Sequence, residues 1–112
     1  MKNEKKYFGT DGIRGKVGSF PITQTFFFKL AVSLASSKKN IKKIIIGKDT
    51  RLSCSLLENA LLNGFDSVKT KSDFIGVVST PILSFYTKLL KYDYGIMISA
   101  SHNPYHDNGI KI

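Results

Sequence analysis

The sequence predicts an α/β fold, a three-layer α/β/α sandwich built on a mixed, mostly parallel sheet. The main observation is an alternation along the chain of amphipathic helix patterns and short apolar strand patterns, which is typical of a sheet with helices on its faces. The second is size, because 112 residues with 42% hydrophobic content give room for one domain with a buried core. The third is that polar loops follow the strand patterns. We therefore expect one domain over residues 1–112.

The first predicted elements are a glycine-rich stretch and a helix. Four glycines fall in the ten residues from Gly9 to Gly18, which predicts a loop or an irregular strand. From Thr23 onward, apolar residues recur at the i, i+3, i+4, i+7, i+8 spacing of one helical face. They are Phe27, Leu30, Ala31, Leu34 and Ala35. A buried helix is expected from here to near the lysines that follow.

A strand and a second helix come next. The β-branched run before Gly47 predicts a strand that is covered on both faces. Ser55 and Glu58 have the S-x-x-E spacing of a capping box, which predicts the start of a helix. Gly64 follows the apolar positions of that helix and is expected to end it.

The last part of the chain repeats the alternation. Residues 75–78 predict a strand, and Pro81 is tolerated in the first turn of the helix that follows. Residues 94–99 predict a third strand, and the final GIKI predicts the start of a further one. Ser79, Thr80 and Pro81 are expected to cap the third helix.

Polar loops leave the carboxyl ends of the three predicted strands, at residues 47–53, 79–81 and 99–109. In open α/β sheets, ligands bind beyond these ends. Functional residues are therefore expected along one edge of the sheet.

Composition argues against several classes of protein. The net charge is +9, from 17 Lys and Arg against 8 Asp and Glu, but the lysines are spread along the chain, so we expect no nucleic-acid partner. We also expect no membrane span, because no apolar run approaches the ~18 residues that one needs. The start of the chain lacks the apolar core of a signal peptide, which predicts a cytoplasmic protein. Cys54 is the single cysteine and is expected to be inert.

The loop after the third strand carries the densest set of reactive side chains. His102 and His106 have an H-x-x-x-H spacing, but Pro104 between them argues against the helix that a zinc site of this kind needs. Ser101 and His102 are neighbours whose side chains diverge in an extended backbone, so a Ser-His hydrolase is not favoured.

A serine displayed at the end of a strand can carry a phosphoryl group instead. A phosphoserine brings roughly −1.5 to −2 charge and needs cations, backbone N–H groups or a divalent metal around it. Lys111, Arg14 and His102 are the available cations, and Asn103-Pro104 would fix the backbone beside Ser101. From spacing alone, a polar turn between strands remains an equal alternative.

Four stretches resemble the first domain of the α-D-phosphohexomutases. They are FGTDGIRG (8–15), IGKDTRLS (46–53), STP (79–81) and ISASHNPYHDNGIKI (98–112), in the family's order. The most specific element is S-A-S-H-N-P followed by D-N-G-I-K. The opening stretch favours the phosphoglucosamine mutase branch, with the phosphomannomutase/phosphoglucomutase branch as the alternative.

The resemblance implies an enzyme that interconverts glucosamine 6-phosphate and glucosamine 1-phosphate, feeding UDP-N-acetylglucosamine and cell-wall synthesis. Ser101 corresponds to the family serine that is phosphorylated at rest and passes its phosphoryl group on through a 1,6-bisphosphate. Its phosphate is also one ligand of an essential Mg²⁺. His102 corresponds to the histidine after it, and Arg14 to the arginine near it. Lys111 corresponds to the lysine implicated in positioning or proton transfer.

Asp49, Arg51 and Asn103 are expected to support the phosphate-bearing loop. Asp49 and Arg51 lie in a loop that the family also carries. An Asp-x-Arg pair at a strand end is also typical of a structural brace, and both interpretations stay open.

The family enzyme is several times longer and builds its cleft from four domains. Its D-G-D-x-D-R metal loop, its sugar-selecting loop and its phosphate-gripping loop are not in this sequence. We therefore expect an incomplete first domain whose partners are a phosphorylated hexosamine and the missing domains, which would hold the remaining Mg²⁺ ligands. Two hypotheses stay open, the serine-bearing segment of a mutase and a truncated remnant without turnover. The chain alone is expected to be inactive, because preorganised metal and phosphate contacts supply most of the barrier reduction in phosphoryl transfer.

Overall fold

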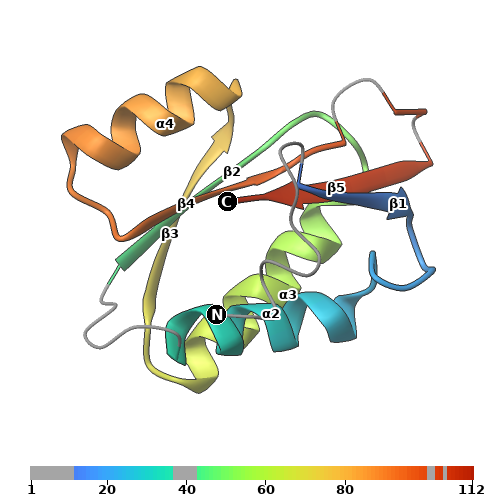
Figure 1. Ribbon diagram of the computed structural model, residues 1–112, viewed down its shortest axis with the longest axis horizontal. Coiled ribbons are helices and arrows are strands. Elements are labelled where there is room, and N and C mark those ends of the chain that lie inside the picture. Colours follow the sequence, from blue (N-terminus) through green and yellow to red (C-terminus); the bar gives the residue numbers. More distant parts are fainter. Residues whose placement is uncertain (1–11, 37–42, 101–102, 105) are drawn as a thin grey trace.

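Five strands in the described residues form one mixed sheet, with helices on both of its faces (Figure 1). The structure is a computed structural model that describes residues 12–36, 43–100, 103–104 and 106–112. The strands are β1 (Ile13–Lys16), β2 (Lys43–Lys48), β3 (Lys71–Val77), β4 (Tyr94–Ile98) and β5 (Asp107–Lys111). Their order in the sheet is β1-β5-β4-β2-β3, with β2 parallel to β3 and β4, and β5 antiparallel to β4 and β1. The predicted α/β class is confirmed.

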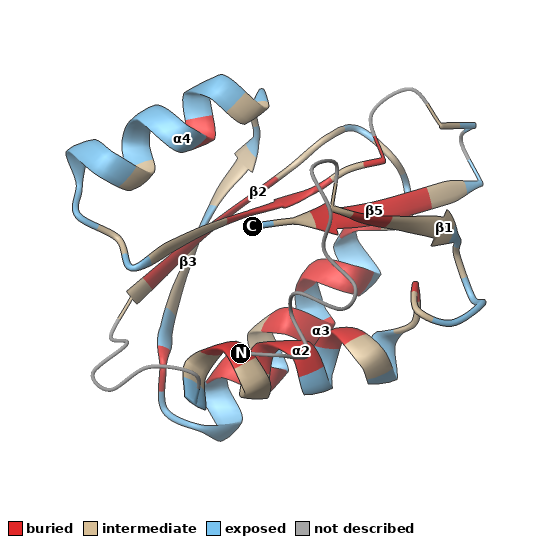
Figure 2. Ribbon diagram, viewed as in Figure 1, coloured by how far each residue is buried: buried red, intermediate tan, exposed pale blue. Residues whose placement is uncertain are grey.

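Helices α2 (Gln24–Ser36) and α3 (Cys54–Ser67) cover one face of the sheet and enclose the main core (Figures 1 and 2). The predicted face of α2 is buried at Phe27, Leu30, Ala31 and Leu34. Ile44 and Ile46 of β2 point into this core, and Ile45 points to the opposite face. The prediction of a strand covered on both faces is therefore confirmed for β2.

The predicted ends of α3 are wrong at both termini. Ser53 is the residue before the helix, Ser55 lies inside it, and Glu58 is paired with Lys48 at 3.2 Å instead of closing a capping box. The helix also continues through Gly64 to Ser67. A Cβ at Gly64 would lie 2.6 Å from both the Ala31 Cβ and the Phe28 carbonyl oxygen, so glycine is needed there for helix contact and not for a turn.

Helix α4 (Thr80–Leu89) covers the other face more sparsely, with Leu83 as its buried residue, packed with Ile45 and Met97. As predicted, Ser79 caps it, because the Ser79 hydroxyl accepts a hydrogen bond from the backbone N–H of Ile82 at 3.4 Å. Figure 2 shows α4 exposed along most of its length. Within the described residues, no helix has the length and apolar character that a membrane crossing requires.

The loops that follow β2 and β4 are joined at one edge of the sheet. The backbone N–H of Asp49 donates to the carbonyl of Ile98 at 3.2 Å, and that of Ser99 donates to the carbonyl of Gly109 at 3.0 Å. Strand β1, read from the sequence only as a loop or an irregular strand, pairs with β5. Arg14 and Gly109 are partners in this pairing, which brings the start of the described chain to the same edge.

Candidate active site

Asp49, the first residue after β2, organises its own loop and contacts the loop after β4. Its Oδ1 accepts a hydrogen bond from the backbone N–H of Arg51 at 2.9 Å. Its Oδ2 accepts from Arg51 Nε at 3.1 Å and from the Ser99 hydroxyl at 2.8 Å. A carboxylate held in this way fixes both the backbone turn and the direction of the arginine side chain.

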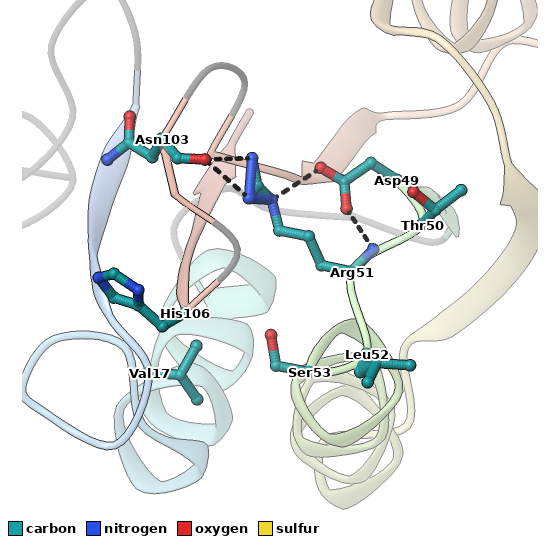
Figure 3. Close-up of a pocket in the computed structure, with 8 residues that line it drawn as sticks. All are labelled: Val17, Asp49, Thr50, Arg51, Leu52, Ser53, Asn103 and His106. Carbon is teal, nitrogen blue, oxygen red and sulfur yellow. Dashed lines mark hydrogen bonds and ion pairs between the residues drawn. The ribbon is translucent and has the colours of Figure 1, made fainter.

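Arg51 extends from this turn to the loop after β4 (Figure 3). Its Nη2 donates to the Asn103 carbonyl at 3.1 Å, and its Nη1 donates to the carbonyls of Asn103 at 3.2 Å and Pro104 at 3.3 Å. The Arg51 side chain is 11% exposed. These hydrogen bonds fit the interpretation of Asp49 and Arg51 as a brace, and the element that they brace is the predicted phosphate-bearing loop.

Asn103 connects this brace to Arg14. The Asn103 carbonyl faces Arg51, and Figure 3 shows its side-chain amide directed away from the arginine. On that side Oδ1 accepts from Arg14 Nη1 at 3.4 Å, and Nδ2 donates to Asp107 Oδ2 at 3.1 Å. Three of the predicted residues, Arg14, Arg51 and Asn103, are therefore in hydrogen-bond contact.

Lys111 and Arg14 lie on the same face of the sheet. Their strand neighbours Ile13 and Ile110 point into the core under α2 and α3, so Arg14 and Lys111 project to the side of α4. Arg14 is paired with Gly109, which makes Lys111 its diagonal neighbour, and such neighbours are about 7–8 Å apart. Lys111 also lines a groove of about 210 Å³ against α4. The pairing of β1 with β5 thus brings the two predicted cations near each other.

A larger cavity of about 690 Å³ lies beside Arg51 (Figure 3). Its lining residues come from the loop after β2, from the loop after β4 and from the turn after β1: Val17, Asp49, Thr50, Arg51, Leu52, Ser53, Asn103 and His106. Neither Arg14 nor Lys111 lines it. Asn103 therefore separates this cavity from the Arg14 contact.

The predicted Ser101 and His102 lie outside the described residues. His106, the other histidine of the loop, places its Nε2 3.4 Å from Asp107 Oδ1, and its side chain is 54% exposed.

The described carboxylates at this edge do not fit a magnesium site. Asp49 accepts hydrogen bonds from Arg51, Ser99 and Cys54, and Asp107 contacts Asn103 and His106. Across the part of the chain that the structure describes, no three His, Cys, Asp or Glu side chains gather as a metal centre would require. We therefore assign no Mg²⁺ ligand to Asp49 or Asp107.

Sequence reasoning missed a buried polar network under the loop. Asn108 is fully buried, and its Nδ2 donates to the Ser53 hydroxyl at 2.8 Å and to Cys54 Sγ at 3.3 Å. The thiol of Cys54 in turn donates to Asp49 Oδ1 at 3.3 Å. Burial raises the pKa of the Cys54 thiol, and Asp49 adds to that rise, whereas the hydrogen bond from Asn108 opposes it. Asn108 lies in β5, and the polar D-N-G pattern carried no signal that its asparagine is buried.

Comparisons with known proteins show which family the chain is similar to. A family model described as "Phosphoglucomutase/phosphomannomutase, alpha/beta/alpha domain I" matches residues 5–112. The chain belongs to this family. It is 50% identical over 113 aligned positions to a phosphoglucosamine mutase of Vibrio campbellii, covering 99% of this chain and 25% of that protein. With a phosphoglucosamine mutase of Aeromonas salmonicida it shares 51% identity, covering 96% of this chain and 24% of that protein.

A solved structure of the family shares the fold. The crystal structure of a putative phosphomannomutase from Thermus thermophilus matches with a TM-score of 0.76 and 31% identity, over 93% of this chain and 24% of that chain. This chain therefore spans about a quarter of the length of the relatives that it matches.

Proposed function

We propose that this chain is the serine-bearing segment of a phosphoglucosamine mutase, and that Ser101 carries the phosphoryl group. The proposal is supported by relatives of that name at about 50% identity and by family membership over residues 5–112. The observation that carries it furthest is the convergence on Asn103, two residues after Ser101, of arginines from two other segments of the chain. A loop that presents a phosphoserine needs both rigid backbone and nearby positive charge.

The reaction is a pair of phosphoryl transfers. The O1 hydroxyl of glucosamine 6-phosphate attacks the phosphorus of the Ser101 phosphate, the bond between phosphorus and the serine oxygen breaks, and a 1,6-bisphosphate forms. After the bisphosphate turns round, the Ser101 hydroxyl attacks the phosphorus on O6, and glucosamine 1-phosphate leaves. In the first step O1 loses a proton and the departing serine oxygen gains one. In the second step the serine hydroxyl loses its proton, the departing O6 gains one, and the serine ends phosphorylated again.

Arg14 and Lys111 supply positive charge on the side of the loop away from Arg51. Arg14 presents a planar fork that suits phosphate oxygens, and Lys111 acts either as a point charge or as the acid and base for the sugar hydroxyls. His102 follows the serine in sequence and completes the set of cations. Mg²⁺ at the Ser101 phosphate would neutralise charge during the transfer. Asp49 and Asp107 are occupied by other contacts, so we expect the further metal ligands to come from the rest of the enzyme.

A coupled assay tests this function and its alternatives together. This chain would be combined with the remaining three-quarters of the Vibrio campbellii relative and supplied with glucosamine, mannose or glucose 1-phosphate. We expect turnover mainly with the glucosamine phosphate and none from the chain alone. Preference for mannose or glucose phosphate would favour the branch named in the Thermus thermophilus structure. No turnover with any sugar would favour an inactive remnant.

A further inference from the structure

Asn103 is contacted from two sides by cations of different segments. Arg51, in the loop after β2, donates to the Asn103 carbonyl through both Nη atoms, at 3.2 and 3.1 Å. Arg14, on β1, donates through Nη1 to the Asn103 side-chain oxygen at 3.4 Å. The carbonyl and the side chain belong to the same residue. Fixing the orientation of the carbonyl therefore restricts the directions that the side chain can take.

The contacts of Arg51 with the described residues are made to protein oxygens. Each of its three guanidinium nitrogens donates to one, Nε to Asp49 and the two Nη atoms to the loop carbonyls. The Asp49 carboxylate also accepts from the Arg51 backbone, so the arginine is tied to its turn at both ends. This arrangement suits a residue that holds another in place better than one that grips a substrate phosphate.

Asn103 is held at further points. Its backbone N–H donates to the Ala100 carbonyl at 3.0 Å, and its side-chain Nδ2 donates to Asp107 at 3.1 Å. With Oδ1 and Nδ2 both engaged, the orientation of the amide plane is determined, and the oxygen is directed toward Arg14.

We propose that Arg51 is a positioning residue for Arg14, acting through Asn103. Loss of the Arg51 fork releases the Asn103 peptide, the amide loses its fixed direction, and the Arg14 guanidinium loses one of the oxygens that orients it. The effect on turnover rests on the function proposed above, in which Arg14 faces the phosphate. The effect on the orientation of Arg14 does not depend on that function.

The variant that isolates the geometry is Arg51→Lys, because lysine keeps the charge but cannot contact a carboxylate and two carbonyls with one planar fork. The matched control is Lys48→Gln. Lys48 precedes Asp49 and pairs with the buried Glu58 at 3.2 Å, so its loss disturbs a neighbouring ion pair outside the brace. Any general loss of stability should appear in both variants.

The first readout uses the 112-residue chain itself. In ¹⁵N NMR spectra we expect Arg51→Lys to shift or broaden the Arg14 side-chain signal. We also expect hydrogen exchange of the Asn103 backbone N–H to speed up on the order of tenfold. The reason is that the Asn103 peptide loses the charge-assisted hydrogen bonds that Arg51 donates to its carbonyl. Lys48→Gln should leave both unchanged. An unaltered Arg14 signal in Arg51→Lys, or the same change in the control, would overturn the proposal.

The second readout is a double-mutant cycle in the reassembled enzyme. If Arg51 acts through Arg14, the losses in kcat for Arg14→Lys and Arg51→Lys should not multiply in the double variant. Losses that multiply would mean that Arg51 acts separately and would contradict the proposal. Should the unmutated assembly be inactive, that result counts against the proposed mutase, and the Arg14 signal alone decides the positioning role.

Discussion

At the scale of single residues, the two serines of the S-A-S motif are assigned different roles. The Ser99 hydroxyl donates to Asp49 Oδ2 at 2.8 Å and is part of the brace. Ser101 is the serine that the family resemblance assigns to phosphoryl transfer. The sequence predicted that Asp49 and Arg51 support the loop, but it carried no information on which atoms they hold. Arg51 binds backbone carbonyls of Asn103 and Pro104, and any two residues at these positions would present carbonyls.

Cys54 illustrates how burial decides the chemistry of a thiol. It lies between the carboxylate of Asp49 and the amide of Asn108, and burial raises its pKa. A thiol whose pKa is raised by folding stabilises the folded state while it is protonated. That contribution is complete below about pH 8.5, where an exposed thiol ionises, and is lost as the pH rises through the higher folded value.

We therefore predict a pH-dependent difference between the chain and its Cys54→Ala variant. The free energy of unfolding should favour the unmutated chain by a constant amount from pH 6 to about 8, and the advantage should shrink above about 8.5. Urea titrations at several pH values measure it. An advantage that grows with pH would mean that the thiolate, not the thiol, is the form stabilised by folding.

At the scale of elements, the periodic patterns predicted the three described helices and the strands β2, β3 and β4. The wrong predictions come from local sequence patterns that were interpreted without the residues that contact them in the folded chain. The Ser55–Glu58 spacing fits a capping box, but Glu58 pairs with Lys48 on the neighbouring strand. Gly64 fits a helix end, but it faces Phe28 and Ala31 of α2. Strand β1 was predicted only as a loop or an irregular strand, because its four residues gain their pairing from β5, at the other end of the chain.

The contact at Gly64 gives a second prediction. Gly64→Ala gains about 1 kcal/mol of helix propensity, but the added Cβ meets a backbone carbonyl that cannot rotate away. We expect the cost of overpacking to exceed the gain in helix propensity, with a net loss of about 1–3 kcal/mol in the free energy of unfolding. The control is Asn63→Ala, the exposed neighbour on the same helix, which should be neutral or slightly stabilising. Equal or higher stability of Gly64→Ala would show that α2 and α3 have room to separate.

At the scale of the whole molecule, one edge of the sheet gathers segments from both ends of the described chain. Arg14 comes from β1, Arg51 from the loop after β2, and Asn103 and Lys111 from the last ten residues. The brace and the cavity beside it lie to one side of Asn103, and Arg14 contacts the other. The sequence correctly predicted polar loops at this edge. It did not predict that Asn103 lies between the brace and Arg14, because that depends on the directions of the Asn103 side chain and carbonyl.

The chain spans about a quarter of the length of its relatives, which bears on what it can do alone. Its described carboxylates at the site edge are occupied by Arg51, Asn103 and other partners. The proposed transfer needs a metal site and contacts for a second phosphate, and we expect these from the domains that the longer relatives carry. The central claim is therefore best tested in an assembly.

The most direct measurement is to locate the phosphate. The chain would be assembled with the rest of the Vibrio campbellii relative, treated with glucosamine 1,6-bisphosphate, digested and sequenced by mass spectrometry. We predict a single phosphate on Ser101, with none on Ser99, and no labelling of a Ser101→Ala variant. A phosphate on Ser99 or elsewhere, or undiminished labelling of Ser101→Ala, would contradict the account.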